Sequence, residues 1–301
     1  MSFLTLFSAP KPFTNPHIAV IQRNAICSWL SLGESVQVVL IGDEAGLAEI
    51  AAELGVLHLP QVACNEQGTP LVSSIFSLAR QVSSAPLLAY VNGDILLLSD
   101  IVQAARQVAS QLDRFLLISQ RWDLSVPQRL DFSPGWETQL RAEIRQRGRL
   151  HPPAGSDVFV FPRSEFEQIP DFAIGRAGWD NWMIYSARKN GIPVVDGTPS
   201  MTVIHQDHDY SHLPGGKPHY DLEESQVNMQ LGGGPGTMYT ILDSTKRLEK
   251  GQIKAPRWSW LWLARRLELW LMPETQERRG WRWGLARKLR RWRRMRTRSR
   301  I

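Results

Sequence analysis

Two acidic residues and a group of histidines in this sequence have the types and positions needed to act on a phosphorylated ligand. Asp94 follows an apolar run, and the Asn92-Gly93 pair before it is typical of a tight turn. Asp180 lies where a helix is expected to begin, and histidines follow it at 205–212. A divalent cation that bridges a diphosphate prefers one or two carboxylate ligands, and a second carboxylate can act as a general base. The combination predicts a metal-assisted transferase that acts on a phosphorylated donor.

Asp94 and His205 are the predicted metal ligands. His205, Asp207, His208 and His212 lie within eight residues, and imidazole is a common metal ligand. His205 is favoured because it directly follows an expected strand, which fixes the direction of its side chain. No cysteine stands beside these residues, which argues against a structural zinc site. Two alternatives remain open: an aspartate that caps the following turn, and a polar loop whose histidines hydrogen-bond locally.

Asp180 is the candidate general base, which would deprotonate an acceptor hydroxyl. It could also be the N-cap of a helix, and the two roles are compatible. Gly178 would allow close approach of the chain, and Trp179 and Trp182 could form an apolar platform for the face of a sugar. Asp157 either binds acceptor hydroxyls or is a turn residue before a strand, and the sequence does not separate these alternatives.

The elements that would position these residues alternate between strand and helix patterns. Strands are expected at 3–8, 36–41, 86–91, 115–119, 157–161, 193–195 and 201–205. Helices are expected at 17–32, 42–54, 69–82, 100–112, 136–147 and 179–189. No clear strand precedes the helix at 136–147, and residues 206–236 are expected to form a long loop or lid. The alternation predicts an α/β fold with a mostly parallel sheet flanked by helices.

Ligands in open parallel sheets bind outside the carboxyl ends of the strands. Three polar segments, 9–12, 42–44 and 92–94, stand at such ends. Each could be an ordinary turn, but all three would lie at one edge of the sheet. The predicted donor contacts at this edge are Pro10, Lys11, Asp43, Asn92 and Asp94.

The positive charge of the chain is concentrated at its end. The 301 residues carry a net charge of +6, but 257–301 holds 14 Arg and one Lys against three Glu, a net charge of +12. Residues 1–256 therefore carry −6. The two cysteines, Cys27 and Cys64, argue against a disulfide scaffold and fit a reducing compartment. Because neither a signal peptide nor an apolar stretch long enough to span a membrane is recognisable, a cytoplasmic location is expected.

The basic segment 257–301 also contains seven of the twelve tryptophans. Five apolar residues follow helical spacing there, with arginines on the other face: Trp281, Leu285, Leu289, Trp292 and Met295. This pattern is typical of an amphipathic helix on an anionic membrane surface, here the inner face of the membrane. Two alternatives remain: 258–272 could pack on the rest of the protein, or the arginine run could be a disordered or nucleic-acid-binding tail. The membrane surface is favoured, and no nucleic-acid partner is expected.

Four sequence elements together resemble glycosyltransferases with the GT-A fold, of a bacterial and especially cyanobacterial branch. They are Tyr-Val-Asn-Gly-Asp at 90–94, Gly-Ser-Asp-Val-Phe-Val-Phe-Pro at 155–162, Gly-Trp-Asp-Asn-Trp at 178–182, and the His-rich segment 205–212. The resemblance covers about residues 1–250, which leaves 251–301 as an amphipathic tail. It implies a nucleotide-sugar donor and Mn²⁺ or Mg²⁺ bound at a DxD motif. This chain departs from the motif, since Asn92-Gly93-Asp94 keeps only the second acid, which is the usual direct ligand.

The resemblance also implies roles for individual residues. Asp94 and His205 would hold the metal, Asp180 would be the base, and Asp43 would contact the base of the nucleotide. Further donor contacts would come from Asn65, Glu66 and Arg121. The residues expected to contact the acceptor, on their own chemistry and position, are Ser156, Asp157, Trp179 and Trp182.

The resulting expectation is transfer of a sugar, from a UDP-sugar by preference, to a hydroxyl of a glycan or glycolipid acceptor. The acceptor could be lipid-linked or a surface polysaccharide. A single base predicts inversion of the anomeric centre, and retention stays open. The alternatives are a non-catalytic nucleotide- or sugar-binding protein on the same fold and a polyanion-binding protein that acts through its tail. A nucleotidyltransferase is disfavoured because residues 8–13 lack a glycine-rich phosphate cradle.

Overall fold

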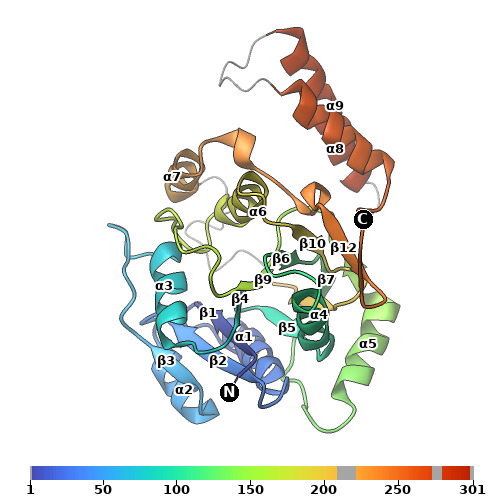
Figure 1. The fold of residues 1–301 in the computed structure, drawn as a ribbon. Helices are drawn as coiled ribbons and strands as arrows, with labels where there is room; N and C mark the ends of the chain where they lie inside the picture. Colours follow the sequence, from blue (N-terminus) through green and yellow to red (C-terminus); the bar gives the residue numbers. More distant parts are fainter. Residues whose placement is uncertain (1, 209–221, 273–279, 299–301) are drawn as a thin grey trace.

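A computed structural model describes residues 2–208, 222–272 and 280–298 of the chain (Figure 1). The elements of the first half are β1 (Leu4–Ser8), α1 (Pro16–Leu30), β2 (Val36–Ile41), α2 (Leu47–Leu54), β3 (Leu57–Leu59), α3 (Val72–Val82), β4 (Leu87–Val91), β5 (Ile95–Leu97), α4 (Asp100–Ala109), β6 (Leu116–Ile118), β7 (Arg121–Leu124) and α5 (Trp136–Arg147). Those of the second half are β8 (Arg149–Leu150), β9 (Val158–Pro162), α6 (Trp179–Lys189), β10 (Val194–Asp196), β11 (Val203–Gln206), α7 (Glu223–Leu231), the 3₁₀ turns η3 (Pro235–Thr237) and η4 (Ile241–Asp243), β12 (Lys246–Glu249), β13 (Gln252–Lys254), α8 (Trp260–Leu271) and α9 (Trp281–Arg298).

The large sheet has nine strands in the order β13-β12-β10-β6-β9-β4-β1-β2-β3. Its pairs are parallel, except that β9 runs antiparallel to both β4 and β6, and β13 runs antiparallel to β12. Helices α1, α2 and α4 pack on one face, and α3 and α6 pack on the other. The α/β fold with a mostly parallel sheet flanked by helices is therefore confirmed.

The central strands are apolar along their whole length because both of their faces are covered. In β4, Leu87, Ala89 and Val91 face the helices α1 and α4, whereas Leu88 and Tyr90 face α3 and α6. The apolar run before Asp94 is thus a strand in the middle of the sheet, and its end is fixed by packing on both sides.

A second, four-stranded sheet in the order β5-β11-β7-β8 lies beside the carboxyl edge of the large sheet. The sequence did not indicate β3, β5, β7, β8, β12 or β13, which have two to four residues each. The expectation of no strand before α5 is wrong, because β7 pairs with β11 in parallel register. The alternation Arg-Trp-Asp-Leu over 121–124 is the period-two signal that could have revealed it.

Helix boundaries differ from expectation mainly where loops precede them. Helix α2 begins only at Leu47, since Gly42 and Gly46 adopt positive φ values of 129° and 83° in the connection. The expected loop at 206–236 contains the helix α7. Residues 209–221 of that segment, His212 among them, lie outside the described residues.

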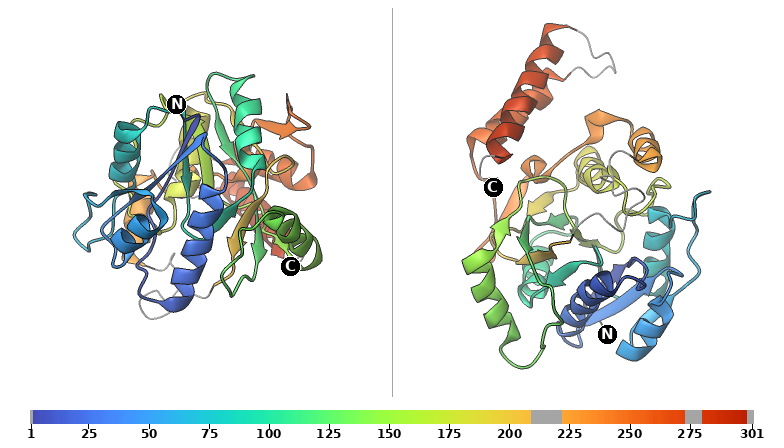
Figure 2. Two further views of the ribbon diagram at one scale, coloured as in Figure 1. Left: turned by 90° about the horizontal axis from the view of Figure 1, so that it is seen from below. Right: turned by 180° about the vertical axis from the view of Figure 1, so that it is seen from behind.

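The C-terminal segment forms a helical hairpin, α8 and α9, that projects from the α/β body (Figure 2). The expected division at residue 250 falls inside the β12–β13 hairpin, so the sheet continues to Lys254. In α8, the guanidinium of Arg265 donates to buried Asp243 of η4 at 2.9 Å. The packing of 258–272 on the body, one of the two alternatives, is therefore observed at this contact. Within the described ranges, no helix is both long enough and apolar enough to cross a bilayer.

Candidate active site

Asp94 lies where the chain passes from the large sheet to the small one, between β4 and β5. The turn before it packs closely on the loop that follows β1. A Cβ atom on Gly93 would lie 3.1 Å from Oε1 of Gln22 and 3.3 Å from Cα of Pro10, so only glycine fits without displacement. The carboxyl ends of β1 and β4 are thereby brought together, and Lys11 comes near enough for its charge to act on Asp94.

The Asp94 carboxylate faces two imidazoles. Its Oδ2 lies 3.1 Å from Nε2 of His208 and 3.8 Å from Nε2 of His205. One ligand atom from each of the three residues lies within 4.8 Å of the others. The Oδ1 atom of Asp94 is buried and has no hydrogen-bond partner among the described residues. A carboxylate and two imidazoles with an unsatisfied buried oxygen fit a divalent cation such as Mn²⁺ or Mg²⁺.

His208 is closer to Asp94 than His205 is, although the sequence favoured His205 as the ligand. His205 lies within β11 and not directly after a strand, and the chain turns after β11 and brings His208 back over the same carboxylate. Burial opposes ionisation of Asp94. The hydrogen bond with His208 and the charges of His205 and Lys11 outweigh it and hold the pKa of Asp94 well below its ordinary value.

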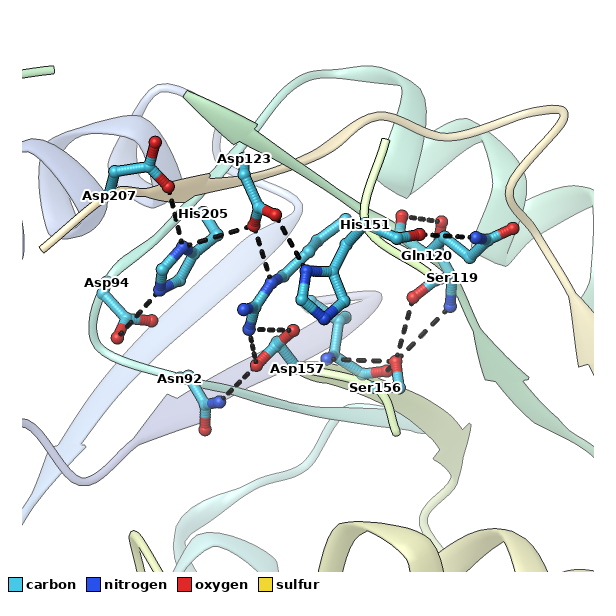
Figure 3. A network of polar contacts seen from close by, with 12 residues as sticks. Asn92, Asp94, Ser119, Gln120, Asp123, His151, Ser156, Asp157, His205 and Asp207 are labelled. Atoms are coloured by element: carbon cyan, nitrogen blue, oxygen red, sulfur yellow. Dashed lines mark hydrogen bonds and ion pairs between the residues drawn. The ribbon is translucent and has the colours of Figure 1, made fainter. Parts of the chain in front are cut away.

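His205 is held between carboxylates on both sides of its ring (Figure 3). Its Nδ1 lies 3.5 Å from Oδ1 of Asp123 and 3.7 Å from Oδ1 of Asp207, which are ion-pair distances. Asp123 also forms hydrogen bonds with Nδ1 of His151 at 2.8 Å and with Nε of Arg121 at 3.0 Å. A carboxylate behind a metal-binding imidazole orients the ring and raises its basicity. The sequence did not indicate Asp123 and His151 as site residues, because β7 was not recognised.

Replacing Asp123 by Asn is expected to weaken Mn²⁺ binding by about 10- to 100-fold, since His205 loses the charge that orients it. Isothermal titration with Mn²⁺ measures this directly. The matched control is Asp100→Asn, because Asp100 is also partly buried and paired with an arginine, Arg141, at 2.8 Å. Equal Mn²⁺ affinities in the two variants would show that Asp123 does not position the imidazole.

A polar network below this group joins β4, β7 and β9 (Figure 3). Asn92 accepts a hydrogen bond from the Tyr90 hydroxyl at 3.0 Å and donates one to Asp157 at 2.8 Å. Arg121 donates to both oxygens of Asp157 at 3.1 Å. Asn92, Arg121 and Asp157, which were predicted to contact donor or acceptor, thus form hydrogen bonds with one another. Asp157 is therefore neither an isolated turn residue nor a free carboxylate.

Ser156 and Trp179 do not lie where acceptor contacts were expected. The buried Ser156 hydroxyl donates to the carbonyl oxygens of Val158 at 2.8 Å and Ser119 at 3.2 Å, so its hydrogen bonds join two backbone segments. Trp179 is 4% exposed and packs edge-on against Tyr90, with ring centroids 4.9 Å apart. Both side chains are therefore buried inside the fold, where backbone carbonyls engage Ser156 and the aromatic core surrounds Trp179. Trp182 is partly buried against Phe172, at 5.3 Å between ring centroids.

Asp180 lies in the first turn of α6, beside the loop that leads into β9. A Cβ atom on Gly155 would fall 1.8 Å from Oδ2 of Asp180, so this carboxylate packs directly on the glycine. Burial, with the nearby charge of Asp157, raises the pKa of Asp180 to about 6 against the opposing hydrogen bond from the backbone of Asn181. A carboxyl group that titrates near neutral pH is suited to act as a general base.

Asp180 and Asp94 both lie near enough to Tyr90 for their charges to act on its hydroxyl. Burial raises the pKa of Tyr90, and the charges of Asp94, Asp157 and Asp180 all add to that shift. The Tyr90 hydroxyl therefore stays protonated with three carboxylates around it. The predicted base and the predicted metal ligand, 86 positions apart in the sequence, are therefore both close to one side chain of β4, Tyr90.

Substituting Gly155 by Ala is expected to displace the Asp180 carboxylate and lower kcat by about 100-fold, because misplacing a reacting group by about 1 Å has effects of that size. Gly236→Ala is the matched control, since nothing lies within 4 Å of the added methyl group there. Turnover by both variants, compared with their nucleotide affinities, checks the prediction. Unchanged kcat in Gly155→Ala would argue against a catalytic role for Asp180.

A cavity of about 700 Å³ opens next to the ends of β2 and β3. Asp43, the predicted contact of the nucleotide base, is among its lining residues, which are Asp43, Glu44, Pro60, Gln61, Val62, Cys64, Gly68 and Pro70. Asn65 accepts a hydrogen bond from the backbone of Thr69 at 2.9 Å and donates to Glu224 at 2.8 Å, so it shapes the rim of the cavity. Glu66 is exposed on the same loop.

No protein-family model and no curated protein sequence matches the chain. Solved structures similar to it are nucleotide-sugar glycosyltransferases. Glucosyl-3-phosphoglycerate synthase from Mycobacterium tuberculosis, in complex with Mn²⁺, UDP and phosphoglyceric acid, matches with a TM-score of 0.47 and 14% identity over 78% of this chain and 79% of that one. A proposed nucleotide-diphospho-sugar transferase from Desulfovibrio desulfuricans matches with a TM-score of 0.42 and 13% identity over 98% of both chains.

TarS from S. aureus, residues 1–349, matches with a TM-score of 0.35 and 10% identity over 55% of this chain and 48% of that one. The match thus spans about half the length of that protein. With identities of 14% or less and TM-scores below 0.5, these similarities extend no further than the fold, and they assign no donor, acceptor or mechanism.

Proposed function

We propose that this protein is a glycosyltransferase that moves a sugar from a nucleotide-sugar donor to an acceptor hydroxyl with the help of a divalent cation. The observation that supports it most is the group of Asp94, His205 and His208 at the carboxyl end of β4, with a buried carboxylate oxygen left unsatisfied. Ligands of open α/β sheets bind at this edge. The resemblance of four sequence elements to GT-A glycosyltransferases, described above, points to the same activity.

The donor would extend from the cavity beside Asp43 toward Asp94. The nucleoside would lie in the cavity, and the diphosphate would lie near Lys11 and the group of Asp94, His205 and His208. A divalent cation bound to these three residues would supply positive charge to the diphosphate. Burial lowers the pKa of the Lys11 ammonium, although the charge of Asp94 opposes this shift. A UDP-sugar is our first choice of donor.

Asp180 would act on the acceptor. As a carboxylate it would take the proton of an acceptor hydroxyl, whose oxygen would attack the anomeric carbon of the donor sugar. The bond between that carbon and the diphosphate oxygen would break, and the nucleoside diphosphate would leave with the electron pair. With a base on the acceptor side and attack opposite the leaving group, the configuration of the anomeric carbon would invert.

Thermal unfolding with a panel of nucleoside diphosphates and nucleotide-sugars, each with and without Mn²⁺, tests the donor site. We expect one nucleotide to raise Tm in the presence of Mn²⁺ by an amount that grows with its concentration. Release of the nucleoside diphosphate on adding glycan or glycolipid acceptors then tests transfer. No stabilisation by any nucleotide would contradict the proposal.

One observation favours a second candidate, a non-catalytic nucleotide- or sugar-binding protein. The first acid of the DxD motif is replaced by Asn92, whose amide is occupied by Tyr90 and Asp157. Only one carboxylate of the motif is left for a cation. Such a protein would show the same nucleotide-dependent stabilisation as an enzyme, but neither transfer nor hydrolysis of the donor.

A further inference from the structure

From the α8–α9 hairpin we infer an interaction surface that lies outside the candidate active site and takes an anionic phospholipid bilayer as its partner. The surface is formed by the outward faces of α8 (Trp260–Leu271) and α9 (Trp281–Arg298), and we call it the hairpin surface. Figure 1 shows both helices standing away from the α/β body. The inference goes beyond the proposed function, because lipid binding by the hairpin surface requires neither donor nor metal.

A buried ionic network fixes which faces of the two helices point inward. Glu268 of α8 is fully buried and accepts from Arg265 at 3.0 Å, from Arg290 at 2.7 Å and from Arg293 at 2.9 Å. Arg265 also binds Asp243 of the body. Three arginines of the tail are therefore paired with two carboxylates, and the same contacts hold α8 against α9 and the body.

The apolar residues that the network does not cover are unusually large and exposed. On α8, Trp260, Leu267 and Trp270 share one side of the helix at intervals of seven and three residues, and Trp260 is 80% exposed. On α9, Trp281, Leu285 and Met295 follow intervals of four and ten residues, and Trp281 is 70% exposed. Soluble surfaces rarely expose so many large apolar side chains unless they bind something apolar.

The outward charges of α9 are positive and unneutralised. Arg287, Lys288 and Arg291 are exposed, and they form no ion pair with any residue in the described ranges. Helix α9 contains no acidic residue at all. Exposed tryptophan and leucine beside a row of basic residues match the two parts of an anionic bilayer surface, its acyl boundary and its phosphates.

A nucleic acid fits this surface less well. Basic residues would bind its phosphates equally, but the exposed Leu267, Leu285 and Met295 offer bases no stacking partner. The headgroup region of a bilayer, in contrast, would accommodate both these apolar side chains and the indole rings. The charge and the apolar residues together therefore favour the bilayer.

Co-sedimentation of the full chain with vesicles of phosphatidylcholine, with and without phosphatidylglycerol, tests the inference. We expect binding to the mixed vesicles and little to phosphatidylcholine alone. Arg287→Gln/Lys288→Gln/Arg291→Gln should weaken binding to mixed vesicles roughly 100-fold. The matched control removes three exposed charges from the body, Arg129→Gln/Arg145→Gln/Lys189→Gln, and should change binding less than threefold.

The apolar contribution is tested separately with Trp260→Ser/Trp281→Ser, which alters one exposed ring on each helix and leaves the Glu268 network intact. Binding to mixed vesicles should fall at least tenfold, whereas Leu150→Ser/Val227→Ser on the body should have no effect. Three results would each overturn the inference: equal losses in hairpin and body variants, no vesicle binding by the unaltered chain, or tight binding to a single-stranded oligonucleotide that outcompetes the vesicles. Nucleotide-induced shifts in Tm, measured on the same variants, report separately on the proposed function.

Discussion

Asp94→Asn should abolish the Mn²⁺-dependent rise in Tm on adding nucleotide and lower turnover by about 10³-fold. The substitution keeps the shape of the side chain but removes the charge that faces His205, His208 and Lys11. A cation that stabilises a leaving diphosphate lowers the activation barrier by several kcal/mol, which corresponds to about three orders of magnitude in rate. Titration of Mn²⁺ into the variant and the unaltered protein, followed by turnover measurements, gives both numbers.

Asp100→Asn serves as the control here as well, because Asp100 is an ion-paired aspartate that does not face the histidines. It should keep both the Mn²⁺ response and the turnover. If Asp94→Asn remains folded by circular dichroism and still shows a full Mn²⁺-dependent shift, the cation does not bind at this carboxylate. The proposed arrangement of the donor would then be wrong.

Asp180→Asn should lower kcat by about 10²- to 10⁴-fold while the affinity for the Mn²⁺–nucleotide complex stays within a factor of two. The reason is that a general base contributes an effect of this size to proton transfer, and we propose that Asp180 acts on the acceptor. Steady-state kinetics for kcat and calorimetry for nucleotide binding separate the two quantities. A parallel loss of nucleotide affinity would place Asp180 in the donor site instead.

The pH dependence of the unaltered protein gives an independent test of the same role. A base acts only as the carboxylate, and the pKa of Asp180 is raised to about 6 by burial and by Asp157. We therefore expect kcat/KM to be half-maximal near pH 6, to level off about one pH unit above it, and to fall tenfold per pH unit well below it. Asp180→Asn should lose this inflection, and an inflection retained in the variant would assign it to another group.

Ionisation of Asp180 should lower the stability of the protein as the pH rises, although it raises the activity. Its pKa is about 6 in the folded protein against an ordinary value of 3.8, so folding favours the neutral form. The ionised carboxylate consequently costs stability above pH 6, and this cost disappears as the pH falls through 6 toward 3.8. Asp180→Asn should raise the free energy of unfolding by up to roughly 3 kcal/mol at pH 8 and by little at pH 4. Urea unfolding at the two pH values measures the difference.

Several features of the fold and site could be predicted from local sequence, because local interactions decide them. Helices α5 and α6 lie at the expected residues, and the strand before Asp94 begins one residue later than expected and ends at the expected residue. The rule that ligands bind at the carboxyl ends of strands then singled out Asp94 and Lys11. The charge imbalance of 257–301 and the helical spacing within it likewise needed no tertiary information.

The composition of the site was decided by the tertiary structure, because pairings between distant strands leave no mark in local periodicity. Pairing of β7 with β11 places Asp123 behind His205, and the antiparallel insertion of β9 between β4 and β6 brings Asp157 to Asn92. Burial of Trp179 and the burial of Glu268 among three arginines depend in the same way on neighbours from elsewhere in the chain. The sequence determined which residue types stand at strand ends and helix starts, and only the packed fold decided which of them meet.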